Sequence, residues 1–184
     1  RDALLARATR LPKIELDAWA LSDVEMLAIG GFSPLEGFMA SRDYQRVVTQ
    51  RHLANGLVWT IPVTLAASRE QIKGLTGDAA LTAEGTLVAI LHLEEVYEPD
   101  KGLEAREVLR TADPRHPGVQ RLQATGPVYL GGPISVVNRP APTTFLPYRL
   151  DPKETRRIFA ERGWRRVVAF QTRNPIHRAH EYIQ

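Results

Sequence analysis

An apolar run that passes into a polar turn near the end of the chain most constrains how it can fold. Residues 167–170 are apolar and residues 171–174 are polar. This order predicts a buried strand over residues 166–170, then a tight turn, then a helix. Asn is favoured just before a helix and Pro at its first position, so we expect the helix to begin at Asn174 and Pro175. The first N–H groups of a helix are unpaired and its dipole is positive there, so the turn is predicted to bind an anion.

The turn and the expected helix carry the side chains that an oxyanion site needs. Arg173 supplies a positive charge, and its planar fork of donors suits bidentate recognition of sulfate or phosphate. His177 and His180, three residues apart, lie on the same side of the expected helix. Neutral donors in the turn come from Gln171, Thr172 and Asn174.

Two other interpretations of the histidine pair stay open at this point. The pair could bind a metal, although zinc-binding helices usually place two histidines four residues apart with an adjacent Glu. Alternatively, His177 and His180 could simply cover the end of a capped helix. The preceding apolar run, the polar turn and the basic surroundings favour the anion site, and we expect no metal bound by the protein.

Charge is distributed unevenly along the chain. The net charge is −2 for residues 1–148 and +5 for residues 149–184, which together make the +3 of the whole chain. An anionic ligand would be steered toward the basic part. The first 148 residues show no basic footprint for nucleic acid, and no apolar run approaches the roughly 20 residues that span a membrane. We therefore expect neither a nucleic-acid nor a membrane partner.

Several catalytic chemistries can be set aside. The chain contains no Cys, which rules out disulfides and thiolate chemistry and fits a cytoplasmic protein. It has neither a P-loop nor a dinucleotide-binding fingerprint, and no Ser lies in a nucleophile-elbow pattern. The polar turn contains no carboxylate, so the sequence does not indicate a paired acid–base mechanism.

Residues 1–145 are predicted to form one β-rich domain. A helix is expected over residues 41–50, with Tyr44, Val47 and Val48 on one face. Strands are expected at residues 57–66, 86–97 and 128–137, the last of them broken by a Gly-Gly-Pro sequence. Strands scattered among short helices, without a regular βαβ rhythm, indicate an α+β or barrel-like fold.

A second domain is expected over residues 146–184. Four prolines punctuate residues 139–152, a pattern typical of a linker. Asp151 and Pro152 are predicted to start a helix that Gly163 ends, and the strand, the turn and the last helix follow. The rhythm of helix, strand and helix is typical of an open α/β sheet. One strand cannot form a stable sheet, so we expect this domain to be a fragment or to be completed by residues absent here.

The chain resembles the ATP sulfurylase (sulfate adenylyltransferase) family. Residues 171–180 match that family's Q-x-R-N-P-x-H-x-x-H signature at every fixed position. The resemblance extends over essentially the whole chain, and its other matching segments are residues 30–39, 59–64, 94–97, 111–119, 154–156 and 163–164.

The resemblance implies a fold and a reaction. The family joins a PUA-like β-barrel domain to a Rossmann-like nucleotidylyltransferase domain. It converts ATP, bound as its Mg²⁺ complex, and sulfate into adenosine 5′-phosphosulfate and pyrophosphate. Further nucleotide-binding motifs of the family lie downstream of these residues, so we expect a chain that ended at Gln184 to be inactive alone. We also expect the full-length protein to form a homo-oligomer.

Roles for individual residues are implied by the same resemblance. Gln171 and Arg173 would hold sulfate. The ATP phosphates would be bordered by Arg173, Asn174, Pro175, Ile176, His177 and His180. The residues assigned to catalysis would be Thr172, Arg173 and Asn174, while His177 and His180 would stabilise the pentavalent transition state and the departing pyrophosphate.

Two other functions stay open at the level of sequence. One is a different adenylyltransferase of the H-x-x-H type, although such enzymes commonly have Gly as the third residue where this chain has Ala179. The other is a PUA-like binding module with a vestigial catalytic tail. PUA-like domains elsewhere bind RNA, which the acidic balance of residues 1–148 does not favour.

Overall fold

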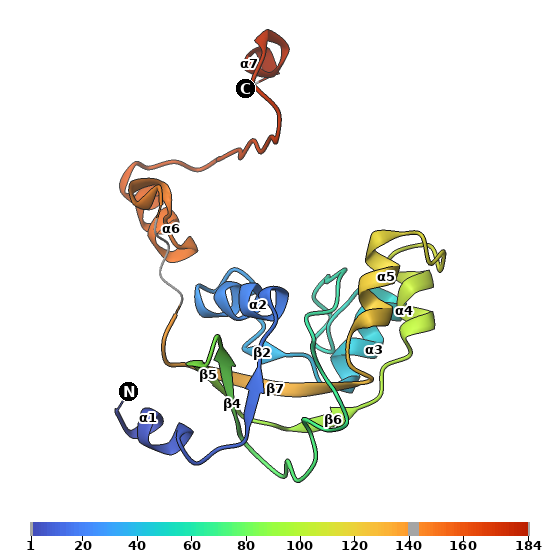
Figure 1. The fold of residues 1–184 in the computed structure, drawn as a ribbon. Coiled ribbons are helices and arrows are strands. Elements are labelled where there is room, and N and C mark those ends of the chain that lie inside the picture. Colours follow the sequence, from blue (N-terminus) through green and yellow to red (C-terminus); the bar gives the residue numbers. More distant parts are fainter. Residues whose placement is uncertain (1, 140–143, 184) are drawn as a thin grey trace. The chain divides into compact units, whose positions relative to one another are not determined.

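The computed structural model describes residues 2–139 and 144–183. The chain divides into two units, Arg1–Arg149 and Leu150–Gln184, and each is described by itself (Figure 1). Helices of the first unit are α1 (Asp2–Ala8), α2 (Ala18–Ala28), α3 (Ser41–Gln50), α4 (Lys101–Glu107) and α5 (Pro117–Ala124), with a 3-10 turn at Leu146–Tyr148. Its strands are β1 (Lys13–Glu15), β2 (Gly37–Phe38), β3 (Leu65–Ala67), β4 (Ala79–Ala83), β5 (Thr86–Leu91), β6 (Glu95–Tyr97) and β7 (Val128–Val136).

The sheet of the first unit is organised around β7, which pairs antiparallel with β2, β3, β5 and β6. Both β3 and β6 pair with Tyr129 and Leu130, so they occupy opposite edges of β7. β2 and β5 pair with the later part of β7, from Gly132 onward. β4 then joins β5, and β1 adds to β4 in parallel. Each edge of β7 therefore carries short strands in succession, and the sheet curls.

The strand expected at residues 128–137 is confirmed, but the expected break lies elsewhere. β7 runs without interruption through its Gly-Gly-Pro sequence, bending at Gly132, whose φ of 149° is a conformation that favours glycine. The interruption falls in the neighbouring segment. Residues 86–97, expected as one strand, form β5 and β6. Across this gap, His92 still donates its N–H to the Pro133 carbonyl at 2.9 Å.

The prediction of a strand over residues 57–66 is wrong for most of that range. Only its end enters a strand, as β3. Pro62 has no N–H to offer a neighbouring strand, and the Trp59 indole donates to the Ile61 carbonyl at 2.8 Å. This local hydrogen bond stabilises a loop where the apolar pattern suggested a strand.

The helix expected over residues 41–50 is confirmed as α3. Tyr44, Val47 and Val48 are its buried residues and belong to the main hydrophobic cluster, which includes residues from β1 to β7. Figure 1 shows α3, α4 and α5 gathered at one end of β7.

A polar cluster at this end ties α4 to the sheet. Glu104 of α4 accepts hydrogen bonds from the Tyr44 hydroxyl at 2.9 Å and the Tyr129 hydroxyl at 3.4 Å. The Tyr97 ring packs within 6 Å of both tyrosine rings. Burial raises the pKa of the Glu104 carboxyl, and the two hydroxyls partly oppose that shift. Burial also raises the pKa of all three tyrosines, so they stay neutral donors.

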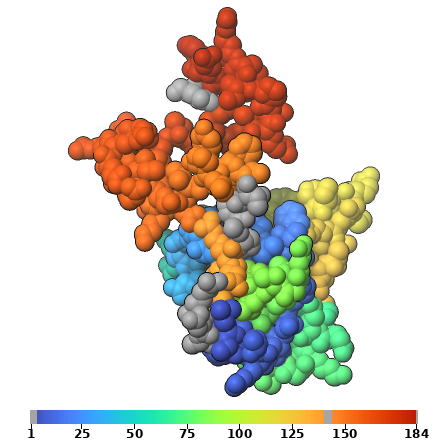
Figure 2. Space-filling view, turned by 60° about the vertical axis from the view of Figure 1, so that its left-hand side comes forward, coloured from blue at the N-terminus to red at the C-terminus, as the bar shows by residue number. Residues whose placement is uncertain are grey.

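The N-terminal helix covers the other end of the sheet. Ala8 of α1 packs with Ala80 of β4 and Ile90 of β5 in a separate small cluster. Arg7 adds an ion pair with Asp78. Figure 2 shows this side, with the blue N-terminal segment beside the bright-green residues around β5.

The second unit begins with α6 (Pro152–Glu161), at the place predicted from sequence. Its start is a capping box, in which the Asp151 N–H donates to the Glu154 carboxylate at 2.7 Å. Gly163 follows the helix with a φ of 65°, as expected of a helix-ending glycine. Trp164 then folds back, and its ring centroid lies 6.0 Å from that of Phe159.

Two predictions for the residues after α6 are wrong: the strand and the position at which the last helix begins. Residues 166–170 are not a strand, and helix α7 spans Arg178–Ile183, three residues later than the start expected at Pro175. A strand needs a neighbour to receive its backbone hydrogen bonds, and the described part of this unit contains none. Consequently, Val168 is 82% exposed where a buried strand was expected.

The overall class is a mixed α/β fold with a curled, β-rich first unit. The open α/β sheet expected for the second unit is not formed by its described residues, which contain two helices and no strand. Across the described ranges, no helix is long and apolar enough to cross a membrane.

The close packing around β7 generates a stability prediction. A Cβ added to Gly131 would lie 2.6 Å from the Ala40 Cα, whereas one added to Gly77 would meet no atom within 4 Å. We expect Gly131→Ala to lower the free energy of unfolding by about 1–3 kcal/mol, as overpacking does. Urea denaturation should show little change for Gly77→Ala, the matched control. Equal stability of the two variants would contradict the tight contact.

Burial of Asp23 on α2 generates a pH prediction. Desolvation, reinforced by Asp17, raises the pKa of Asp23 from 3.8 to about 6, although Arg121 opposes the shift. The folded protein then holds this proton more tightly than the unfolded chain. Its contribution to stability is present below pH 3.8 and is lost as pH rises through about 6.

The Asp23→Asn variant tests this. It should stabilise the protein more at about pH 8 than at about pH 4, because only the carboxylate is penalised by burial. The measurement is the free energy of unfolding at both pH values. A substitution effect that does not change with pH would show that Asp23 titrates normally.

Candidate functional site

The polar turn of the second unit is held by a local hydrogen-bond pair. The Asn174 N–H donates to the Thr172 hydroxyl oxygen at 3.1 Å, and the Thr172 hydroxyl donates to the Asn174 carbonyl at 3.1 Å. This geometry places Arg173 at the tip of the turn. Arg173 is exposed and, among the described residues, pairs with no acidic side chain. Its guanidinium is therefore available to an anion.

The two histidines lie together where α7 begins. His177 precedes the helix, and its carbonyl accepts the N–H groups of His180 at 2.9 Å and Glu181 at 3.2 Å. The two imidazole rings stack, with centroids 3.9 Å apart. The His177 N–H also points to Nδ1 of His180 at 3.4 Å. A proton on Nε2 of His180 is the tautomer that fits this contact, and it leaves Nε2–H as a donor.

The site residues expected from sequence fall into two groups. The structure brings together Thr172 with Asn174, and His177 with His180. Gln171, Pro175 and Ile176 are exposed, Ile176 to 61%. The proposed cradle at a helix N-terminus is thus replaced by a turn, followed by an extended segment and a later helix. Within the described ranges, no three His, Asp or Glu side chains lie close enough to hold a metal ion.

This arrangement can hold an oxyanion but gives it little protection from water. A guanidinium, two imidazoles and two amides are suited to sulfate or phosphate oxygens. The described residues of the second unit include none that is buried. Charge interactions that are strong in an enclosed site are weak in contact with water. The side chains of this segment are therefore of the types that bind anions, but because they are exposed to water we expect them to bind an anion weakly.

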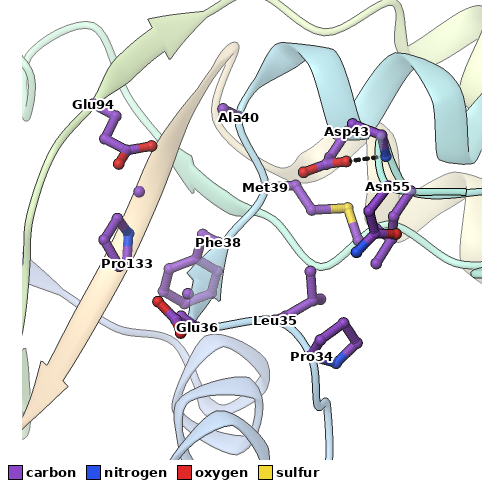
Figure 3. A pocket seen from close by; sticks show the side chains of 14 residues that line it. Pro34, Leu35, Glu36, Phe38, Met39, Ala40, Asp43, Asn55, Glu94 and Pro133 are labelled. Carbon is purple, nitrogen blue, oxygen red and sulfur yellow. Dashed lines mark hydrogen bonds between the residues drawn. The ribbon is translucent and has the colours of Figure 1, made fainter. Parts of the chain in front are cut away.

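The cavities of the first unit leave no signal in the sequence. One cavity of about 370 Å³ lies between the 34–40 segment, α3 and β7 (Figure 3). Its polar lining includes the carboxylates of Glu36, Asp43 and Glu94, and Asp43 accepts the Ala54 N–H at 2.6 Å. Three carboxylates repel sulfate and ATP, so this cavity does not suit those anions. No sequence pattern links its residues, because they come from four separate segments.

Two known protein families match this chain, one over most of the first unit and the other over the second unit and the few residues before it. The PUA-like domain family matches residues 1–139, and the ATP-sulfurylase family matches residues 147–184. The second match contains the turn and both histidines.

Individual relatives match the whole chain. A probable bifunctional SAT/APS kinase 2 of Sorangium cellulosum is 55% identical over 100% of this chain and 32% of its own length. A sulfate adenylyltransferase of Symbiobacterium thermophilum is 50% identical over 100% of this chain and 47% of its own length. The chain thus spans about a third to a half of the length of the curated relatives it matches.

A solved structure is similar across the chain as well. The hexameric APS kinase from Thiobacillus denitrificans has a TM-score of 0.75 and 30% identity, and the match covers 100% of this chain and 33% of that one. With a family match over most of its length, the chain belongs to the PUA-like domain family over residues 1–139, and residues 147–184 match the ATP-sulfurylase family.

Proposed function

We propose that the protein to which this chain belongs is a sulfate adenylyltransferase, which transfers AMP from MgATP to sulfate and releases pyrophosphate. The observation that carries the proposal is the Gln171–His180 segment, which lies inside the ATP-sulfurylase match. Relatives at about 50% identity that bear this enzyme's name support it. The exposed Arg173 and the stacked histidines supply the chemistry that two anionic substrates require.

The proposed reaction depends on positioning and electrostatics. A sulfate oxygen attacks the α-phosphorus, the bond to the bridging oxygen breaks, and pyrophosphate leaves with the electron pair. Sulfate is already an anion, so no general base is needed. The main obstacle is bringing two anions together, and fixed donors lower that cost. Mg²⁺ arrives with ATP as part of the substrate.

Roles are proposed residue by residue. Gln171 and Arg173 bind sulfate, and Arg173 also faces the ATP phosphates. Thr172 and Asn174 act in catalysis, where their mutual hydrogen bonds hold the turn that presents Arg173. His177 and His180 donate to the transition state and the leaving pyrophosphate. Pro175 and Ile176 border the ATP phosphates through the backbone.

Three wider expectations accompany this function. We propose a PUA-like domain over residues 1–145 and the beginning of the catalytic domain from residue 146. Homo-oligomerisation of the full-length protein stays a prediction, which the description of the solved relative as hexameric makes reasonable. The cytoplasmic location also stays a prediction.

Arg173→Ala in the full-length protein should lower molybdate-dependent formation of AMP from ATP by at least about 100-fold, the scale of losing one oxyanion donor. Folding should change little, because Arg173 is exposed and forms no ion pair with another described residue. Arg178→Ala, an exposed arginine within the same motif, is the matched control and should keep most of the activity. Equal losses from both substitutions would assign the effect to general charge.

His180→Ala should lower kcat more than it weakens ATP binding, because its Nε2–H is proposed to act on the transition state. Steady-state kinetics and equilibrium ATP binding separate the two effects, and circular dichroism checks the fold. If the variant unfolds while turnover per folded molecule survives, the His177–His180 stack is structural.

A further inference from the structure

Three side chains from neighbouring strands of the first unit are connected by hydrogen bonds. Asp78 comes directly before β4, His92 comes directly after β5, and Ser135 lies in β7. The Nδ1 atom of His92 lies 2.9 Å from Oδ2 of Asp78, and its Nε2 atom lies 2.8 Å from the hydroxyl oxygen of Ser135. A serine bonded to an imidazole, which is in turn oriented by a carboxylate, is the arrangement that makes a serine hydroxyl nucleophilic.

The register of the sheet brings these three groups to one face. The pairing of β4 with β5, continued by one residue, sets Asp78 opposite His92. β5 and β7 pair Ile90 with Ser135. Side chains two residues apart on a strand share a face, so His92 lies diagonally across from Ser135. Asp78 also forms an ion pair with Arg7 of α1, which fixes the carboxylate from a second element.

The carboxylate decides which nitrogen of the neutral His92 ring carries the proton. A carboxylate only accepts hydrogen bonds, so the proton lies on Nδ1 and is donated to Asp78. Nε2 is then an acceptor, and the Ser135 hydroxyl donates to it. The His92 side chain is 33% exposed and Ser135 is half-buried, so a small molecule can reach both.

We propose that Ser135 is a nucleophile that takes an acyl group from a small activated ester. The Ser135 Oγ forms a bond to the carbonyl carbon of the ester, and Nε2 of His92 receives the hydroxyl proton. The bond from this carbon to the leaving oxygen then breaks, and the leaving group departs with the electron pair and takes the proton from His92. The products are an ester of Ser135 and a free alcohol or phenol, so the step needs no further reactant.

The position of Ser135 in the sheet limits the esters that can react. Ser135 lies within the β5–β7 ladder, opposite Ile90, and not at a strand-to-helix turn where free N–H groups form an oxyanion hole. One such donor contributes about 10²–10³-fold to a rate. We therefore expect reaction only with esters that have a good leaving group, such as aryl esters, and slow hydrolysis of the acylated serine. The site lies wholly in the first unit and is independent of the Gln171–His180 segment.

Incubation of the full-length protein with p-nitrophenyl acetate, followed by peptide mapping with mass spectrometry, tests the proposal directly. We expect an acetyl group on Ser135 and an initial burst of p-nitrophenol in an amount equal to the acetylated serine. Acetylation confined to lysine and histidine side chains, with Ser135 unmodified, would overturn the proposal.

Substitutions then test whether His92 activates the serine. His92→Gln should slow the acetylation of Ser135 about 100-fold, because the general base is lost. Ser22→Ala, which changes an exposed serine on α2, is the matched control and should leave that rate unchanged. Circular dichroism checks that both variants are folded. Acetylation of Ser135 at the same rate in the folded His92→Gln variant as in the unmodified sequence would show that the hydrogen-bonded histidine is only structural.

Discussion

Close backbone contacts at Gly37 and Gly131 allow β7 to pair with four other strands. Gly131 lies against the backbone of Met39 and Ala40, and a Cβ on Gly37 would overlap the Gly132 carbonyl oxygen. Side chains at these points would push the edges of the curled sheet apart. The packing of α3 and the Tyr–Glu104 cluster against this sheet depends on that closeness, as do the cavities beside it.

The described residues of the second unit make no such close backbone contact at a glycine, and their structure shows the effect of lacking it. Short-range sequence signals do determine where its first helix begins and ends: the Asp151–Glu154 capping box starts α6, and Gly163 ends it. Its described residues form no strand, and Val167, Val168 and Phe170 are exposed although their sequence is that of a buried strand. The groups of the Gln171–His180 segment that we propose bind an oxyanion are therefore exposed to water, which limits the strength of every charge interaction there.

Predictions based on short-range chemistry were mostly confirmed. The α3 helix with its buried face and the boundaries of α6 followed from apolar periodicity and capping residues. Predictions that needed a partner strand failed more often, as at residues 57–66 and 166–170. The residue types of the candidate anion site and its family resemblance could be identified in the sequence. The burial of the Arg46 Nε without a hydrogen bond to another described residue could not, because it depends on which segments pack around α3.

By itself the sequence determined the helix ends, the apolar faces and the order of chemical groups in the Gln171–His180 segment, because each depends on residues within a few positions of one another. It also placed the chain in its family. Only the tertiary structure decided that β7 is continuous while its neighbour is interrupted, that Asp23 is buried enough for its pKa to rise, and that the Arg46 Nε is buried without a hydrogen-bond partner among the described residues. Those outcomes depend on which distant segments meet, and strand pairing and desolvation are properties of that meeting.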